Sequence, residues 1–156
     1  MWLNDIVGQD CPVDAVFVLD GSDSVDDVEW PLMISFLNQL VARLDIDNGN
    51  TRVGALSYSS AIDSFFNLNQ YTTVVGVQSG ISGLLHEKDG TDTEKALIFV
   101  RTDMLIAPAG DRDDVPNVVV VMTDGKSKNT TVTMVCMMRK TSLFQKLHRV
   151  RKKRSQ

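Results

Sequence analysis

Three stretches of this chain place oxygen-bearing side chains where apolar segments end or where a helix begins. One apolar run, Val-Phe-Val-Leu, is followed by Asp20, Ser22 and Ser24 at alternate positions. A second stretch contains Thr91. A third begins with a run of valines and ends at Asp124. Carboxylate and hydroxyl oxygens are the ligands that hard divalent cations prefer in proteins. We predict that these side chains form one metal site.

The expected chemistry of this site is binding rather than catalysis. Mg²⁺ takes about six oxygen ligands and usually keeps some of its waters. If the hydroxyls bind directly and the carboxylates act through waters, the ion stays electron-poor and accepts a carboxylate from another molecule. His86 and His148 are isolated, and the chain contains neither a Gly-x-Ser-x-Gly sequence nor a phosphate-binding P-loop. The sequence therefore predicts a protein that is not an enzyme.

The segments that must position these side chains predict an α/β domain. Four segments have the composition of strands: residues 14–20, 51–58, 62–68 and 118–123. Three have the periodicity of helices: residues 24–44, 72–85 and 93–105. Helices that separate buried strands favour a doubly wound, mostly parallel sheet with helices on both faces. Ser24 and Thr93 are the expected caps of the first and third helices.

This arrangement would bring the oxygen-bearing residues to one edge of the sheet. In doubly wound sheets, ligands bind outside the carboxyl ends of the strands. Asp20 and Asp124 both follow predicted strands, and Thr91 immediately precedes a predicted helix. The predicted topology thus favours the same metal site as the residue types do.

The length and composition suit one globular domain: 156 residues, of which 43% are hydrophobic and 23% are charged. No apolar run approaches the roughly 20 residues of a membrane span. The N-terminus lacks the basic and apolar regions of a signal peptide. The protein is therefore either intracellular or recorded as a fragment of a longer secreted chain.

Charge is distributed unevenly along the chain. All 20 acidic residues precede residue 125, and eight of the 16 basic residues follow residue 138, so residues 1–128 carry −12 and residues 129–156 carry +8. The basic run from Arg149 to Arg154 could touch nucleic acid or act as a localisation signal. We expect a solvated tail instead, with no nucleic-acid partner. Leu143, Leu147 and Val150 could face one side of a helix in this tail.

Together the three stretches resemble the metal-ion-dependent adhesion site of the von Willebrand factor type A (VWA) domain. That motif consists of Asp-x-Ser-x-Ser, a distant Thr, and an Asp after the fourth strand. It matches this chain at Asp20, Ser22, Ser24, Thr91 and Asp124, and the resemblance covers about residues 13–128. The flanking sequence, such as Cys-Pro-Val-Asp-Ala-Val-Phe-Val-Leu-Asp, is similar to the sequences of extracellular-matrix members of the family, such as type VI collagen and matrilin-like chains.

The resemblance implies a Rossmann-like fold and a function. It implies Mg²⁺, with Mn²⁺ or Ca²⁺ as substitutes, and a partner that completes the metal shell with an acidic residue. That partner would be an extracellular matrix protein or a cell-surface receptor, and the protein would be secreted. The alternative is an intracellular VWA-type domain that acts in the assembly of protein complexes.

Two departures from the family pattern bear on these expectations. Residue 23 is Asp where many members have Gly, which adds charge beside the site. After Ser127 the chain diverges, so we expect a leader at residues 1–12, a partial VWA domain at 13–128 and a divergent basic segment at 129–156. Residues 132–138 could form one strand, but the loss of later strands would leave an open sheet edge. Asn129 begins a glycosylation sequon, and a disulfide between Cys11 and Cys136 stays open.

Overall fold

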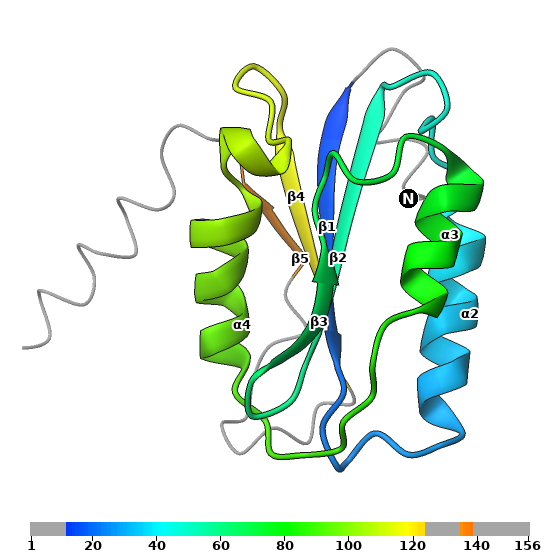
Figure 1. The fold of residues 1–156 in the computed structure, drawn as a ribbon, viewed down its shortest axis with the longest axis vertical. Coiled ribbons are helices and arrows are strands. Elements are labelled where there is room, and N and C mark those ends of the chain that lie inside the picture. The colour runs from blue at the N-terminus through cyan, green and yellow to red at the C-terminus, as the bar shows by residue number, and fades with distance from the viewer. Residues whose placement is uncertain (1–11, 124–134, 139–156) are drawn as a thin grey trace, which may run out of the picture.

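The computed structural model describes residues 12–123 and 135–138, which form a sheet with helices on both faces (Figure 1). The strands are β1 (Val13–Asp20), β2 (Thr51–Tyr58), β3 (Ile62–Phe66), β4 (Asn117–Met122) and β5 (Val135–Met138). The helices are α2 (Glu29–Val41), α3 (Val74–Ser82) and α4 (Thr93–Phe99), which continues as the π-helix η1 (Val100–Met104), and the 3-10 turn η2 (Ala107–Ala109). The predicted order of strands and helices is confirmed.

The sheet has the strand order β3-β2-β1-β4-β5. The three central strands run parallel, with Asp20 opposite Tyr58 and Leu19 opposite Met122. Antiparallel strands form both edges: β3 as the hairpin partner of β2, and β5 beside β4. The predicted α/β class is therefore confirmed, as a mixed sheet. The edge of β4 that we expected to be open is paired with β5 from Asn117 to Val120.

The central strand is buried on both faces because helices cover each side of it. Every residue of β1 is buried. Phe17 and Leu19 point into one core beneath α2 and α3, where Leu37 and Ile81 are fully buried. Alternate residues such as Val18 point into a second core beneath α4 and η1. This two-sided burial explains why the strand reads as a continuous apolar run.

The predicted start of the first helix and the predicted cap of the third helix are wrong, whereas the third helix begins at Thr93 as predicted. The first helix begins at Glu29 rather than Ser24, because the Asp26 carboxylate accepts from the backbone N–H groups of Val28 and Glu29 and forms the entry turn. The third helix is capped by Asp92, whose carboxylate accepts from the N–H of Lys95, and not by Thr93. The predicted helix at 72–85 is confirmed as α3, with Thr73 as its cap.

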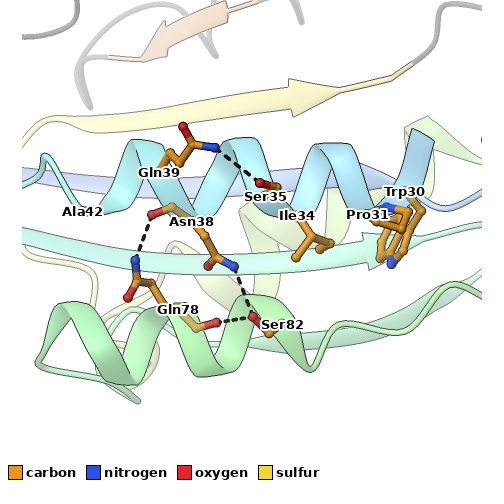
Figure 2. A pocket seen from close by; sticks show the side chains of 9 residues that line it. All are labelled: Trp30, Pro31, Ile34, Ser35, Asn38, Gln39, Ala42, Gln78 and Ser82. Atoms are coloured by element: carbon orange, nitrogen blue, oxygen red, sulfur yellow. Dashed lines mark hydrogen bonds between the residues drawn. The ribbon is translucent and has the colours of Figure 1, made fainter. Parts of the chain in front are cut away.

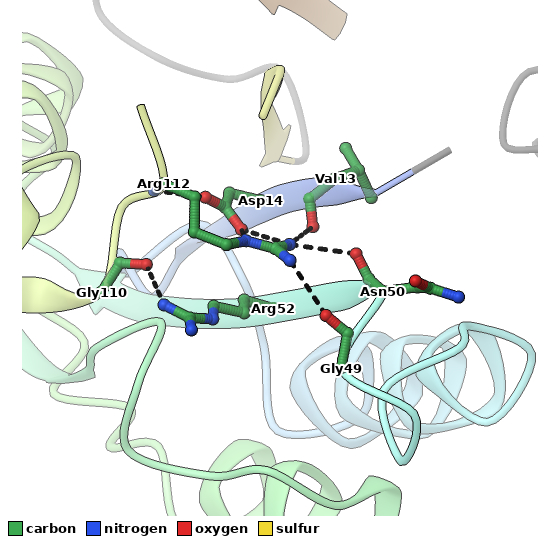
Figure 3. A network of polar contacts seen from close by, with 7 residues as sticks. All are labelled: Val13, Asp14, Gly49, Asn50, Arg52, Gly110 and Arg112. Atoms are coloured by element: carbon green, nitrogen blue, oxygen red, sulfur yellow. Dashed lines mark hydrogen bonds and ion pairs between the residues drawn. The ribbon is translucent and has the colours of Figure 1, made fainter. Parts of the chain in front are cut away.

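An arginine holds the start of β1 at the end of the sheet opposite the candidate site (Figure 3). The guanidinium of Arg112 pairs with the buried carboxylate of Asp14 at 2.7 Å, and the N–H of Arg112 donates to the same carboxylate. The guanidinium also donates to the carbonyls of Val13, Gly49 and Asn50. The Arg112 side chain therefore links the loop that precedes β4 to the first residues of β1 and to the turn before β2.

Among the described residues, no helix has the length and apolar character needed to cross a membrane.

Candidate metal site

Asp20 is the last residue of β1, and the fold buries its carboxylate at the carboxyl edge of the sheet. Its side chain is only 1% exposed. One carboxylate oxygen accepts from the Ser22 N–H at 3.0 Å, and the other accepts from the Thr123 hydroxyl at 2.8 Å. In the described part of the chain, no lysine, arginine or histidine forms an ion pair with it. Asp20 is thus a buried acid that neutral donors orient.

The two predicted serines lie on the loop that leaves β1. Ser22 is 1% exposed, and its hydroxyl lies 3.1 Å from the hydroxyl of Ser24. The hydrogen bond from Ser22 N–H back to Asp20 folds the loop into a tight turn, which places all three side chains on the same short segment. The structure therefore brings together three of the five predicted ligands.

The Thr91 segment is anchored to this loop by backbone hydrogen bonds. Lys88 N–H donates to Gly21 C=O at 3.1 Å, and Asp23 N–H donates to Asp89 C=O at 3.0 Å. At the other end of the segment, Asp92 N–H donates to Ser59 C=O at 2.8 Å. Thr91 lies half-buried between these anchors. The predicted ligand Thr91, 67 positions beyond Ser24 in the sequence, is thereby brought to the same edge of the sheet.

The third stretch reaches the site through β4. Since β4 lies next to β1 in parallel register, its carboxyl end is level with Asp20. Thr123, the residue after β4, donates its hydroxyl to the Asp20 carboxylate. Asp124 and Asn129 lie outside the described residues. Thr123 is the residue that sequence reasoning missed, although its position just before Asp124 in the third stretch was a usable signal.

The donor set fits a hard divalent cation. Asp20, Ser22, Ser24 and Thr91 offer only oxygen, which suits Mg²⁺, Mn²⁺ or Ca²⁺. In residues 12–123 and 135–138 there is no group of three or more His, Cys, Asp and Glu side chains that could hold a metal. The carboxylate of Asp20 has its two oxygens held by neutral donors, so its negative charge is left for a cation.

Acidic side chains lie around the outside of the site. Burial raises the pKa of Asp63 above its ordinary value, and the nearby charges of Glu87 and Asp89 raise it further, against a hydrogen bond from Ser59. His86, which we expected to be an isolated surface residue, stacks on Trp30 with ring centroids 4.6 Å apart. The carboxylates of Asp63, Glu87 and Asp89 add negative charge beside the candidate metal loops, which favours a bound cation.

Comparison with known proteins identifies relatives in the extracellular matrix. Residues 14–150 match the family model of the von Willebrand factor type A domain. Matrilin-1 of Gallus gallus is 31% identical over 122 residues, which are 78% of this chain and 25% of matrilin-1. The collagen alpha-4(VI) chain of Mus musculus is 32% identical over 135 residues, which are 85% of this chain and 6% of the collagen chain. This chain therefore spans a quarter or less of these two relatives.

Solved structures share the fold. Proximal thread matrix protein 1 from the mussel byssus superimposes with a TM-score of 0.70 at 25% identity, over 80% of this chain and 34% of that one. Another structure of the same mussel protein, described as having a zinc-occupied MIDAS motif, gives a TM-score of 0.71 at 21% identity over 92% of this chain and 36% of that one. Taken with the family match over residues 14–150, these findings show that the chain belongs to the von Willebrand factor type A domain family, with relatives among matrilins and type VI collagen.

Proposed function

We propose that this domain is a protein-binding module of the extracellular matrix whose contact with its partner depends on a divalent cation. Asp20, Ser22, Ser24, Thr91 and Asp124 would hold the cation, and Mg²⁺ is the ion that suits their oxygens best. The observation that carries the proposal is the buried Asp20 carboxylate, which the Ser22 N–H and the Thr123 hydroxyl hold beside paired serine hydroxyls.

The cation would supply a Lewis-acidic position that an acidic side chain of the partner completes. The chain's own residues prepare this position. Ser22 N–H and Thr123 fix the orientation of the Asp20 carboxylate, and the Ser22–Ser24 contact orients two neutral hydroxyls. Because these hydroxyls carry no charge, they leave more of the cation's charge for the partner's carboxylate.

The matrix location and the kind of partner rest on the relatives. Matrilin-1 and the collagen alpha-4(VI) chain belong to the extracellular matrix, and the mussel protein is a thread matrix protein, one structure of which is described as having a zinc-occupied MIDAS motif. We therefore propose that the domain is secreted and that it binds a matrix protein or cell-surface receptor through an exposed acid. Binding, rather than catalysis, is the role that this donor set supports.

The test is calorimetric titration of Mg²⁺ and Mn²⁺ into the metal-free chain. We expect one site in the wild type and no measurable binding in Asp20→Ala or Thr91→Ala. The matched controls are Asp103→Ala and Thr102→Ala, because these exposed residues bond to each other on η1, at the far end of the helix that begins next to Thr91. Circular dichroism should show that all four variants are folded.

Partner binding is then measured with immobilised fibrillar collagen as the first probe, in Mg²⁺ and in excess chelator. We expect retention in Mg²⁺, loss in chelator and loss with Thr91→Ala. Undiminished binding in excess chelator would refute the metal-bridged mechanism, even if the cation itself binds. Metal binding that survives Asp20→Ala would refute the assignment of the site.

A further inference from the structure

Tyr58 is the last residue of β2, and it is buried at the edge of the sheet where the candidate metal loops meet. It lies opposite Asp20 in the parallel register of β1 and β2. Its exposed fraction is 0%, and its ring belongs to the second core, together with Ala96 and Val100. A buried phenol needs a hydrogen-bond partner for its hydroxyl, and the packing of its ring fixes where that hydroxyl points. Tyr58 therefore presents a polar group at a fixed position beside the candidate site.

The main chain and the side chain of Tyr58 contact different metal loops. Its C=O accepts from the N–H of Gly21, in the loop after β1, at 2.7 Å. Its hydroxyl lies 3.0 Å from the hydroxyl of Thr93, which is two positions after Thr91. Because Asp92 caps α4, the Thr93 hydroxyl is not needed for the helix start. Tyr58 thus joins the loop after β1 to the segment before α4.

The turn between β2 and β3 holds the same segment by further contacts. The C=O of Ser59 accepts from the Asp92 N–H at 2.8 Å. The Ser60 hydroxyl donates to the Asp89 carboxylate, and the Lys95 ammonium donates to the Ser60 C=O at 2.8 Å. Both Ser60 contacts are exposed, so water competes for their donors and acceptors. A contact to a buried side chain is less affected by this competition and holds the segment more firmly.

The position of Thr91 depends on such contacts, because residues 84–92 form neither helix nor strand. A segment of this kind has many alternative conformations, and the contacts at its ends restrict them. Residues that orient metal ligands typically change metal affinity by about 10- to 100-fold when they are removed. Tyr58 acts through Thr93 and not on Thr91 directly, so we expect a smaller effect.

We propose that Tyr58 is a positioning residue of the candidate metal site. Its hydroxyl, bonded to Thr93, holds the segment that carries Thr91 against the loop after β1. The inference goes beyond the proposed ligand set, because none of the three stretches that predicted the site contains Tyr58. Its effect on cation affinity rests on the proposed function, whereas its effect on the segment can be measured without any cation.

Hydrogen bonds between α2 and α3 offer a comparison for a purely structural contact (Figure 2). The Gln78 amide of α3 donates to the Asn38 C=O of α2 at 3.0 Å, and the Asn38 amide donates to the Ser82 hydroxyl at 3.1 Å. Asn38 lies toward the C-terminal end of α2, away from the loop after β1. Gln78→Ala therefore removes a hydrogen bond between distant segments without removing a contact of the metal loops.

Hydrogen exchange in chelator tests the positioning. Tyr58→Phe removes the hydroxyl but keeps the ring, so the core stays filled. We expect the Asp92 amide to exchange at least about threefold faster in this variant than in the wild type, because the segment opens more often. The controls are Gln78→Ala and Tyr71→Phe, which makes the same chemical change at the other tyrosine of the chain, on a ring that packs against Phe66. Neither control should change the exchange of Asp92.

Titration of Mg²⁺ measures the effect on the cation site. We expect Tyr58→Phe to raise the Kd about fivefold, which is the effect of one hydrogen bond of ordinary strength. Thr93→Val should raise it equally, and the double variant should lose no more than either single variant, because both substitutions remove the same contact. Thr93→Ser keeps the hydroxyl and should bind as the wild type does. Tyr71→Phe and Gln78→Ala should also keep the wild-type Kd.

The two measurements separate this inference from the proposed function. Unchanged Asp92 exchange in Tyr58→Phe, or an equal increase in Gln78→Ala, would overturn positioning by Tyr58. The inference also fails if the wild type binds the cation and Tyr58→Phe keeps its Kd, or if the effects of Tyr58→Phe and Thr93→Val add. If the wild type binds no cation, the proposed function fails, and the exchange rates alone decide the inference.

Discussion

Asp14 and Arg112 form an ion pair, and removal of either partner alone would destabilise the folded protein. Asp14 is completely buried, and the Arg112 side chain is 21% exposed. The carboxylate receives the guanidinium and the Arg112 N–H, while the remaining guanidinium donors reach three backbone carbonyls. Removing one partner of such a buried pair leaves an uncompensated charge in a low-dielectric environment.

We expect Arg112→Ala to lower the free energy of unfolding by about 3–5 kcal/mol, because it leaves the Asp14 carboxylate buried without its cation. Urea denaturation measures the change. The matched control is Arg52→Ala, which removes only a hydrogen bond to the Gly110 carbonyl and should cost about 1–2 kcal/mol. Equal losses of stability in the two variants would show that the ion pair contributes no more than the single hydrogen bond of Arg52.

Asp63 lies near the candidate metal loops, and its ionisation makes the free energy of unfolding depend on pH. Burial, followed by the charges of Glu87 and Asp89, raises the pKa of Asp63 above the ordinary 3.8. The folded protein therefore keeps this proton at pH values where the unfolded chain has released it. By linkage, the stability contribution of Asp63 is greatest at low pH and is lost as the pH rises through the folded-state pKa.

The variant Asp63→Asn should remove this dependence, because the amide cannot ionise but still accepts from Ser59. In chelator, we expect the urea midpoint of the variant to exceed that of the wild type by a margin that grows as the pH rises above 3.8. Ser59→Ala serves as a control, since it removes the hydrogen bond and leaves the carboxylate. A margin that is constant with pH would contradict the raised pKa.

At the scale of elements, α3 depends on a close contact at Gly80 that the sequence alone does not reveal. Gly76, Gly80 and Gly83 make it look like a weak helix. A Cβ atom on Gly80 would lie 2.5 Å from Cε2 of Tyr71 and 3.0 Å from Cε1 of Phe66. These two rings form an edge-to-face pair at 5.2 Å. The glycine therefore admits the aromatic pair that joins α3 to the edge of the sheet.

Gly80→Ala should consequently destabilise the domain by about 1–3 kcal/mol, although alanine is the better helix former, because overpacking outweighs propensity. Gly83→Ala is the matched control, since a Cβ there would meet nothing nearer than 3.5 Å. Thermal and urea unfolding measure both variants. If Gly80→Ala proved as stable as Gly83→Ala, the ring pair would have to shift at little cost.

At the scale of the whole molecule, the proposed cation would join the loops after β1 and β4 to the loop before α4. A ligand that binds only the folded state stabilises it by mass action, by about 1.4 kcal/mol when its concentration is tenfold above Kd. For a domain of this size, that corresponds to a rise in Tm of about 3–6 °C. Scanning calorimetry with and without Mg²⁺ should show this rise in the wild type and none in Asp20→Ala. A similar rise in both would indicate a different cation site.

Much of the fold was predictable because its signals are local. Buried parallel strands read as apolar runs, and the order of strands and helices followed from them. Helix caps were less predictable: Ser24 and Thr93 have the chemistry of caps, but Asp26 and Asp92 form the hydrogen bonds. Several residues near a helix start compete for the same free N–H groups, and loop geometry decides which side chain reaches them.

The sequence by itself determined the α/β class and the residue types of the candidate metal site, because strand patterning and the spacing of Asp20, Ser22 and Ser24 are properties of short segments. Only the tertiary structure decided that the segment leading to Thr91 meets this loop, through the backbone hydrogen bonds that Lys88 and Asp23 donate. It alone showed that Thr123 orients Asp20 and that Leu32 and Phe36 of α2 are exposed. These features depend on how distant segments pack, and no local pattern encodes the relative position of two segments.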